Sequence, residues 1–122
     1  MGKKILVVDD SSTVRQQVRI ALSQAGYTVV EAVDGMDGQS KIRENSDLAM
    51  VICDVNMPRM SGLQMLEAVR KSGCAVGVPI VMLTSEAQPA LIRQAKAQGA
   101  KGWIVKPFKA EMLVAAVNKL AT

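Results

Sequence analysis

Short apolar runs, mostly of β-branched residues, recur along this chain and are separated by longer segments with helical periodicity. Three of the runs, the first, third and fourth, are apolar without a break, as expected of strands that are covered on both faces of a sheet. A short connection cannot join parallel strands, whereas a helix can. The pattern therefore predicts strands joined by helices, with the strands at 5–8, 28–30, 50–53, 80–83 and 103–105.

The segments between these runs carry apolar residues at helical spacing, and small or capping residues mark their ends. The best example has Val14, Val18 and Leu22 before Gly26, and another lies between Ser61 as a predicted N-cap and Gly73 as a stop signal. The segment 37–45 is the least regular, because only Ile42 anchors it. In the last helix the predicted apolar stripe is Met112, Leu113, Ala116, Val117 and Leu120.

Strands that alternate with helices indicate an α/β fold with a parallel sheet and helices on both faces. Five such units suit the flavodoxin-like (βα)5 arrangement, with the strand order 2-1-3-4-5. We predict one domain over residues 1–122, since the sequence contains no linker, repeat or low-complexity stretch.

Composition excludes several classes of protein. With 49% hydrophobic and 21% charged residues the chain can bury a core, and its longest apolar run is far shorter than the roughly 20 residues of a membrane helix. The sequence contains no histidine, CxxC or GxxxxGK[ST] motif, which argues against a zinc site, a Ser-His-Asp triad and a P-loop. We expect a cytoplasmic protein that binds neither membranes nor nucleic acid, since aromatic residues are only 2% of the chain.

Polar residues follow four of the five predicted strands: Asp9 and Asp10, then Asp54, Thr84 and Lys106. In a parallel sheet these strand ends meet at one edge, which is where such folds bind ligands. Neighbouring carboxylates repel one another unless they are protonated or a cation holds them. Oxygen ligands without histidine or thiolate favour Mg²⁺, and a lysine with a threonine suits a phosphoryl group. Asp54 stands alone at its strand end and is the better candidate for a carboxylate nucleophile.

Each of these residues also has a purely structural interpretation. A single aspartate after a strand is commonly a turn former or a helix cap, and Ser12 could begin the first helix. The coincidence at four strand ends favours a site. Two other Mg²⁺- or phosphate-binding classes stay open at this point: a phosphatase with a nucleophilic aspartate, and a flavodoxin-like cofactor binder.

Four motifs together resemble the receiver domains of bacterial two-component response regulators, and they span essentially the whole chain. They are ILVVDDSSTVR, VICDVNMPRMSGL, PIVMLTSEA and GAKGWIVKPF. Among receivers the chain is most similar to the single-domain chemotaxis type, since Asn56 and Glu86 each lie two residues after a site residue, as in that group.

The resemblance implies a role for each matching position. Asp54 would accept a phosphoryl group from a sensor histidine kinase, Thr84 and Lys106 would contact the phosphoryl oxygens, and the Lys106–Pro107 bond would be cis. Mg²⁺ would be the cofactor. Its direct protein ligands would be Asp10, Asp54 and the backbone carbonyl of Asn56, and Asp9 would bind it through water.

The resemblance also implies how the signal leaves the domain. Thr84 and Trp103 would form the switch, Asn56 and Glu86 would tune hydrolysis, and the face of the fourth helix, fifth strand and fifth helix would bind a target. That part of the chain is rich in lysine and arginine, so we expect an acidic partner surface, for example on a flagellar motor switch.

Several expectations complete this interpretation. The protein would catalyse only its own phosphorylation and dephosphorylation, and would be a monomer or weak dimer. The chain ends after the fifth helix, which we interpret as leaving no DNA-binding domain. The alternatives are a receiver fragment of a larger regulator and a phosphorelay intermediate, and Trp103 could instead simply pack against the fourth helix.

Overall fold

The computed structural model describes residues 3–55, 60–73, 77–85 and 89–121. Its strands form one parallel sheet in the order β2-β1-β3-β4-β5, so the predicted flavodoxin-like α/β fold is confirmed. The strands are β1 (Lys4–Val8), β2 (Thr28–Ala32), β3 (Leu48–Asp54), β4 (Ile80–Thr84) and β5 (Gly102–Val105).

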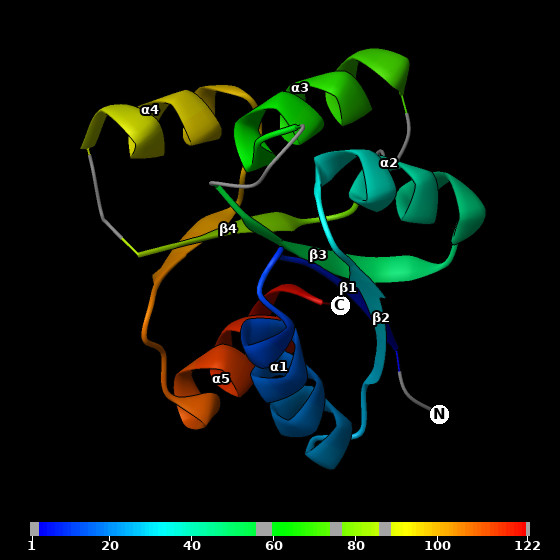
Figure 1. Ribbon diagram of the computed structural model, residues 1–122, viewed down its shortest axis with the longest axis vertical. Helices are drawn as coiled ribbons and strands as arrows, with labels where there is room; N and C mark the ends of the chain where they lie inside the picture. The colour runs from blue at the N-terminus through cyan, green and yellow to red at the C-terminus, as the bar shows by residue number, and fades with distance from the viewer. Residues whose placement is uncertain (1–2, 56–59, 74–76, 86–88, 122) are drawn as a thin grey trace.

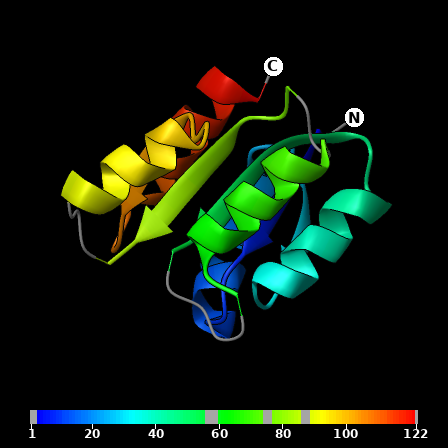
Figure 2. The ribbon, with the colours of Figure 1, turned by 90° about the horizontal axis from the view of Figure 1, so that it is seen from above.

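Helices cover both faces of the sheet (Figures 1 and 2). They are α1 (Ser12–Gln24), α2 (Gly35–Glu44), α3 (Gly62–Ser72), α4 (Pro89–Ala97) and α5 (Ala110–Leu120). Two separate cores result: α2, α3 and α4 pack on one face, and α1 and α5 pack on the other. The three-layer arrangement leaves the ends of the strands as the places where polar side chains can gather.

The order of the strands explains their composition. The continuously apolar runs are β1, β3 and β4, and these are the three inner strands of the sheet. The outer strands β2 and β5 are only partly buried along most of their length. Continuous apolar character therefore identified the strands that have a neighbour on each side and a helix on each face.

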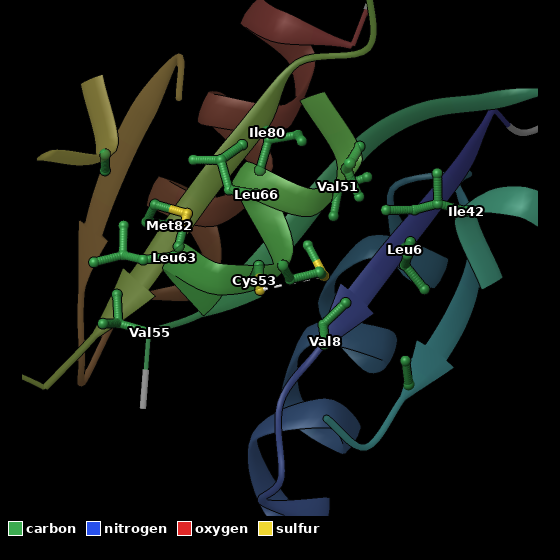
Figure 3. Packing of buried hydrophobic residues seen from close by; sticks show 14 of the residues in the cluster. Leu6, Val8, Ile42, Val51, Cys53, Val55, Leu63, Leu66, Ile80 and Met82 are labelled. Carbon is green, nitrogen blue, oxygen red and sulfur yellow. Dashed lines mark hydrogen bonds between the residues drawn. The ribbon is translucent and has the colours of Figure 1, made fainter. Parts of the chain in front are cut away.

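The core between the sheet and α2, α3 and α4 is made of interlocking aliphatic and sulfur-containing side chains (Figure 3). Leu6, Val51 and Met82 of the inner strands are fully buried there, and Leu66 of α3 packs among them. Burying a side chain of this size contributes roughly 1.5–3 kcal/mol. Cys53 lies in the same core as a free thiol, while Cys74 is outside the described residues.

The ends of α1 and α3 follow the capping rules. Ser61 caps α3 in a capping box with Gln64, and Gly73 ends that helix, both as predicted. Helix α1 begins at Ser12, as the structural interpretation of that residue expected, and Ser11 caps it, because the Ser11 hydroxyl accepts the N–H of Val14.

The least regular predicted helix, α2, is present and begins at Gly35, before the predicted start. Asp34 caps it, and its side chain accepts the Asp37 N–H at 2.8 Å. A Cβ at Gly38 would lie 2.8 Å from the Met65 sulfur and 3.0 Å from Val8, so α2 packs closely through a glycine. This explains why an apolar stripe is missing from its sequence.

Met112 of the predicted stripe in α5 faces solvent and does not lie in the core. Met112 is 61% exposed, while Leu113 and Val117 are fully buried. Residues four apart share a helix face, and Met112 is about 100° away from that face. In the part of the chain that the structure describes, no helix has both the length and the apolar character needed to cross a membrane.

Candidate functional site

The register of the inner strands sets polar residues side by side at one edge of the sheet. Val8 pairs with Cys53, so Asp9 and Asp54, which follow them, are neighbours. Asp54 in turn pairs with Leu83, and Thr84 with Val105, so Thr84 and Lys106 extend the same row. The sequence prediction that these strand ends meet is confirmed.

Three carboxylates form the acidic part of this site, which we call the acid cluster: Asp9, Asp10 and Asp54. One oxygen from each lies within 4.8 Å of the others. Asp9 is fully buried and Asp54 is 5% exposed, whereas Asp10 is exposed to solvent. The cluster is therefore exposed to solvent at Asp10 and buried at Asp9 and Asp54.

Asp9 is held by a contact at each of its polar groups. Its N–H donates to the Ala32 carbonyl at 3.1 Å, and its own carbonyl accepts from Arg15 Nη1 at 2.6 Å. Of its carboxylate oxygens, Oδ1 accepts the Ser11 N–H at 2.9 Å and Oδ2 accepts from Lys106 Nζ at 2.9 Å. A buried carboxylate needs such partners, since an unpaired one would be strongly destabilising.

Lys106 bridges the two buried carboxylates. Its Nζ lies 2.9 Å from Asp9 Oδ2 and 3.2 Å from Asp54 Oδ1. Burial would lower the pKa of Lys106, but hydrogen bonding to Asp9 and the charge of Asp54 outweigh it, so this pKa is raised. Lys106 is therefore a cation at neutral pH, placed where it offsets part of the acidic charge.

The positive charge of Lys106 offsets only part of the negative charge of the acid cluster. Burial, followed by the charge of Asp9, raises the pKa of Asp54 to about 6, although Lys106 acts in the opposite direction. Next to it, burial raises the pKa of the Cys53 thiol far above its ordinary value, so this thiol stays protonated. The acid cluster thus holds more negative charge than its protein neighbours neutralise, and a further cation would stabilise it.

The donor set fits Mg²⁺. All three side chains offer hard carboxylate oxygens, and the described residues around them contribute no imidazole or thiolate ligand. The exposed side of the cluster leaves room for the water ligands that Mg²⁺ retains.

Thr84 and Lys106 are joined through the backbone as well as by register. The Lys106 N–H donates to the Thr84 carbonyl at 2.6 Å, and Thr84 is 1% exposed. The Lys106–Pro107 peptide bond is cis, as the family resemblance implied. The structure therefore places Lys106 in contact with Asp54, and Thr84 at the end of the neighbouring strand β4.

Trp103 lies on β5 and is partly buried against the core that contains Ala95 of α4 and Met82 of β4. That it packs against the fourth helix itself stays a prediction. Its indole Nε1 is buried and has no hydrogen-bond partner among the described residues. Such a group lowers stability by about 1–3 kcal/mol relative to a paired one.

Gly62 supports the site although the sequence analysis gave it no role. A Cβ at this position would lie 2.1 Å from the carbonyl oxygen of Asp54, and the Gly62 N–H donates to the Val55 carbonyl at 2.8 Å. Only glycine allows α3 to begin this close to the end of β3. Its position in the motif VICDVNMPRMSGL was the available signal.

Arg15 and Glu31 are two further residues near the site that were not predicted from the sequence. Arg15 Nε donates to Glu31 Oε1 at 3.1 Å while Nη1 of the same side chain holds the Asp9 carbonyl. Asn56 and Glu86, which were predicted to bind Mg²⁺ and to tune hydrolysis, lie outside the described residues.

Comparison with known proteins agrees with this geometry. The family model described as "Response regulator receiver domain" matches residues 5–118. The Chemotaxis protein CheY1 of Helicobacter pylori is 40% identical over 111 residues, which cover 90% of each chain. A CheY homolog of Campylobacter jejuni is 38% identical over 111 residues, 90% of this chain and 85% of that protein.

Solved structures show the same relationship. The chemotaxis protein CheY4 of Vibrio cholerae superposes with a TM-score of 0.92 at 40% identity, and the match covers 98% of this chain and 99% of that one. Fold, sequence motifs and the arrangement of strand-end residues therefore lead to one conclusion: the chain belongs to the response regulator receiver domain family of two-component signalling.

Proposed function

We propose that this protein is a chemotaxis-type receiver that is switched by Mg²⁺-dependent phosphorylation of Asp54. The observation that carries the proposal is the acid cluster, whose carboxylate oxygens lie within 4.8 Å of one another beside the Lys106 ammonium. The similarity to CheY proteins of Helicobacter and Campylobacter supports the assignment to chemotaxis.

Asp54 is the proposed nucleophile. A carboxylate oxygen of Asp54 bonds to the phosphorus of a phosphohistidine on a sensor kinase, and the phosphorus–nitrogen bond breaks, which leaves the imidazole with the electron pair. A bound Mg²⁺ would supply positive charge for the phosphoryl oxygens. It would be held by Asp10, Asp54 and the backbone carbonyl of Asn56, and by Asp9 through water. The chemistry ends on the protein's own side chain, so we propose a signalling protein and not a turnover enzyme.

Lys106 and Thr84 then bind the transferred group. Lys106 already lies 3.2 Å from Asp54 Oδ1 and can exchange this contact for a phosphoryl oxygen. Thr84, at the end of the neighbouring strand, offers its hydroxyl as a hydrogen-bond donor. Asn56 and Glu86 are proposed to control how quickly water removes the group.

The output surface is proposed to be the face formed by α4, β5 and α5, which we call the basic face. Its basic residues are Arg93, Lys96, Lys101, Lys109 and Lys119, all of them exposed. Val105 and Met112 are exposed apolar side chains on the same elements, at 43% and 61%. Thr84 and Trp103 connect it to the site by way of β4 and β5, and a cytoplasmic partner with an acidic surface fits its charge.

The direct test is incubation with acetyl phosphate and Mg²⁺, followed by intact-mass spectrometry. We expect a gain of about 80 Da, the mass of one phosphoryl group in an acyl phosphate. Asp54→Asn should abolish the adduct. Asp47→Asn is the matched control, since Asp47 is an exposed aspartate whose side chain is 67% accessible, and it should leave the adduct intact. An adduct that persisted in Asp54→Asn would contradict the proposal.

A further inference from the structure

Arg15 reaches from α1 to the backbone of the acid cluster. Its Nη1 donates to the carbonyl oxygen of Asp9 at 2.6 Å, a short distance for a charge-assisted hydrogen bond. That carbonyl belongs to the peptide unit that joins Asp9 to Asp10. Because a peptide unit is planar, holding its oxygen also sets the direction in which the Asp10 backbone continues.

A second contact holds the Arg15 guanidinium itself. Arg15 Nε donates to Glu31 Oε1 at 3.1 Å, and Arg19 Nη1 occupies the other oxygen of Glu31 at 2.7 Å. The Arg15 side chain is 14% exposed and Glu31 is 29% exposed, against 47% for Arg19. Arg15 is therefore the well-buried member of this network and the one that contacts the site.

Asp10 needs such support more than its neighbour does. Asp9 is also fixed by its N–H and both carboxylate oxygens, while Asp10 is exposed at the open side of the cluster. Its position depends on the direction of the chain that leads to it. A metal site loses affinity when a ligand is free to take other positions, because binding must then order it.

We propose that Arg15, oriented by Glu31, is a positioning residue for Mg²⁺ binding: it fixes the Asp9–Asp10 peptide so that Asp10 faces the other two carboxylates. This inference rests on the proposed function, which supplies the metal. Arg15 does not touch the carboxylates of the cluster in any contact the structure gives. It acts through the backbone.

The charge of Arg15 and its positioning of the backbone have opposite effects on Mg²⁺ affinity, and this makes the inference testable. The Arg15 cation repels a divalent ion, so a variant that merely lost the charge would bind Mg²⁺ more tightly. Arg15→Lys keeps the charge but loses the planar fork that reaches two acceptors at once. Weaker Mg²⁺ binding by Arg15→Lys can therefore come only from lost geometry.

The experiment is a calorimetric titration of the folded protein with MgCl₂, well below its melting temperature. We expect Arg15→Lys to bind Mg²⁺ roughly tenfold more weakly than the wild type, the lower end of the range for residues that orient metal ligands. Glu31→Gln, which removes the ion pair that orients Arg15 and thereby weakens its hold on the Asp9 carbonyl, should lose several-fold in Mg²⁺ affinity. Arg19→Lys is the matched control: it alters the same network at a residue with no contact to Asp9 among the described residues, and it should stay within about twofold.

A purely structural role would lower the metal-free melting temperature of Arg15→Lys and leave its Mg²⁺ affinity unchanged. Equal Mg²⁺ affinity in Arg15→Lys and wild type would overturn this inference alone. So would an equal loss in Arg19→Lys. If the wild-type protein bound no Mg²⁺, the proposed metal site would fail as well, and the two failures are thereby distinguished.

Discussion

Two parts of the sheet, which we call its halves, are built differently: β1 with β3, and β5 with the neighbouring helix α4. On one side, β1 and β3 are buried almost throughout and end in the acid cluster, whose member Asp9 has a partner for every polar atom. On the other side, β5 is only partly buried, and Ala95 is the one fully buried residue among those described in α4. This second side also carries the basic face and the buried indole N–H of Trp103, for which the described part of the chain offers no hydrogen-bond partner.

This difference in burial separates a part of the sheet suited to holding ligands from a part suited to changing its arrangement. A site for a divalent ion and a phosphoryl group works best when its ligands are held in place. A surface that must change in response to that site is better built from elements with few buried contacts and small differences in energy between arrangements. In this protein the border between the two is β4, whose last residue is Thr84.

The largest expected difference between the halves is in their contribution to folding stability. Ile5 on β1 is fully buried and Ile104 on β5 partly buried, and both belong to the core under α1 and α5. We expect Ile5→Ala to lower the free energy of unfolding by about 4 kcal/mol and Ile104→Ala by about 2 kcal/mol. Urea denaturation of both variants measures this, and equal losses would break the comparison.

Gly62 and Gly102 provide the next test. A Cβ at Gly62 would be 2.1 Å from the Asp54 carbonyl, while at Gly102 on β5 the nearest atom would be 3.5 Å away, an ordinary contact. Gly62→Ala should lower stability by about 3 kcal/mol and reduce formation of the acyl phosphate, because the end of β3 must shift. Gly102→Ala should lower stability by less than about 1 kcal/mol and leave phosphorylation unchanged. The reverse order would show that the acid-cluster half is not the more tightly built one.

The charge in the acid cluster gives a pH-dependent prediction. Since the pKa of Asp54 is raised from 3.8 to about 6, the folded state binds this proton more tightly than the unfolded chain does. The stability that this group contributes is present below about pH 4 and is lost as the pH rises through 6. Without Mg²⁺, Asp54→Asn should therefore gain about 1–2 kcal/mol over the wild type at pH 8 and little at pH 4.

Thermal melts at both pH values measure this gain. Saturating Mg²⁺ should shrink it, because the ion stabilises the wild-type cluster more than the variant. A gain of the same size at pH 4 and pH 8 would count against the raised pKa as its cause.

The smallest effect is expected on the basic face. Lys96 is an exposed residue of α4, so Lys96→Glu should change stability by less than about 0.5 kcal/mol. Phosphorylation by acetyl phosphate should stay within about twofold of the wild type, since this residue is not part of the acid cluster. A large loss of phosphorylation would show that the basic face and the acid cluster do not act as separate parts of the protein.

Local patterns predicted the features that depend on one segment at a time. Continuous apolar runs identified the inner strands, and the polar residues that follow them predicted the members of the site, since parallel strands end at a common edge. The weak helix α2 was harder, because it packs through Gly38 and not through a row of large side chains. Met112 was misplaced because one position along a helix turns a side chain out of the core.

The remaining features depend on contacts between distant segments. The Arg15 contacts join a helix to an edge strand and to a backbone carbonyl, and nothing in the residue's immediate neighbourhood indicates them. The raised pKa of Asp54 likewise depends on burial and on charges from other strands. Contacts and pKa shifts of this kind arise only when distant segments come together in the folded chain.

The most direct measurement locates the phosphoryl group. After treatment with acetyl phosphate, borohydride reduces an aspartyl phosphate to homoserine, which tandem mass spectrometry places in the sequence. Homoserine at position 54, formed with Mg²⁺ and lost when the ion is chelated, is the predicted result. Homoserine at another aspartate, or the same yield at position 54 without Mg²⁺, would contradict the assignment of the acid cluster as a magnesium-dependent phosphoacceptor site.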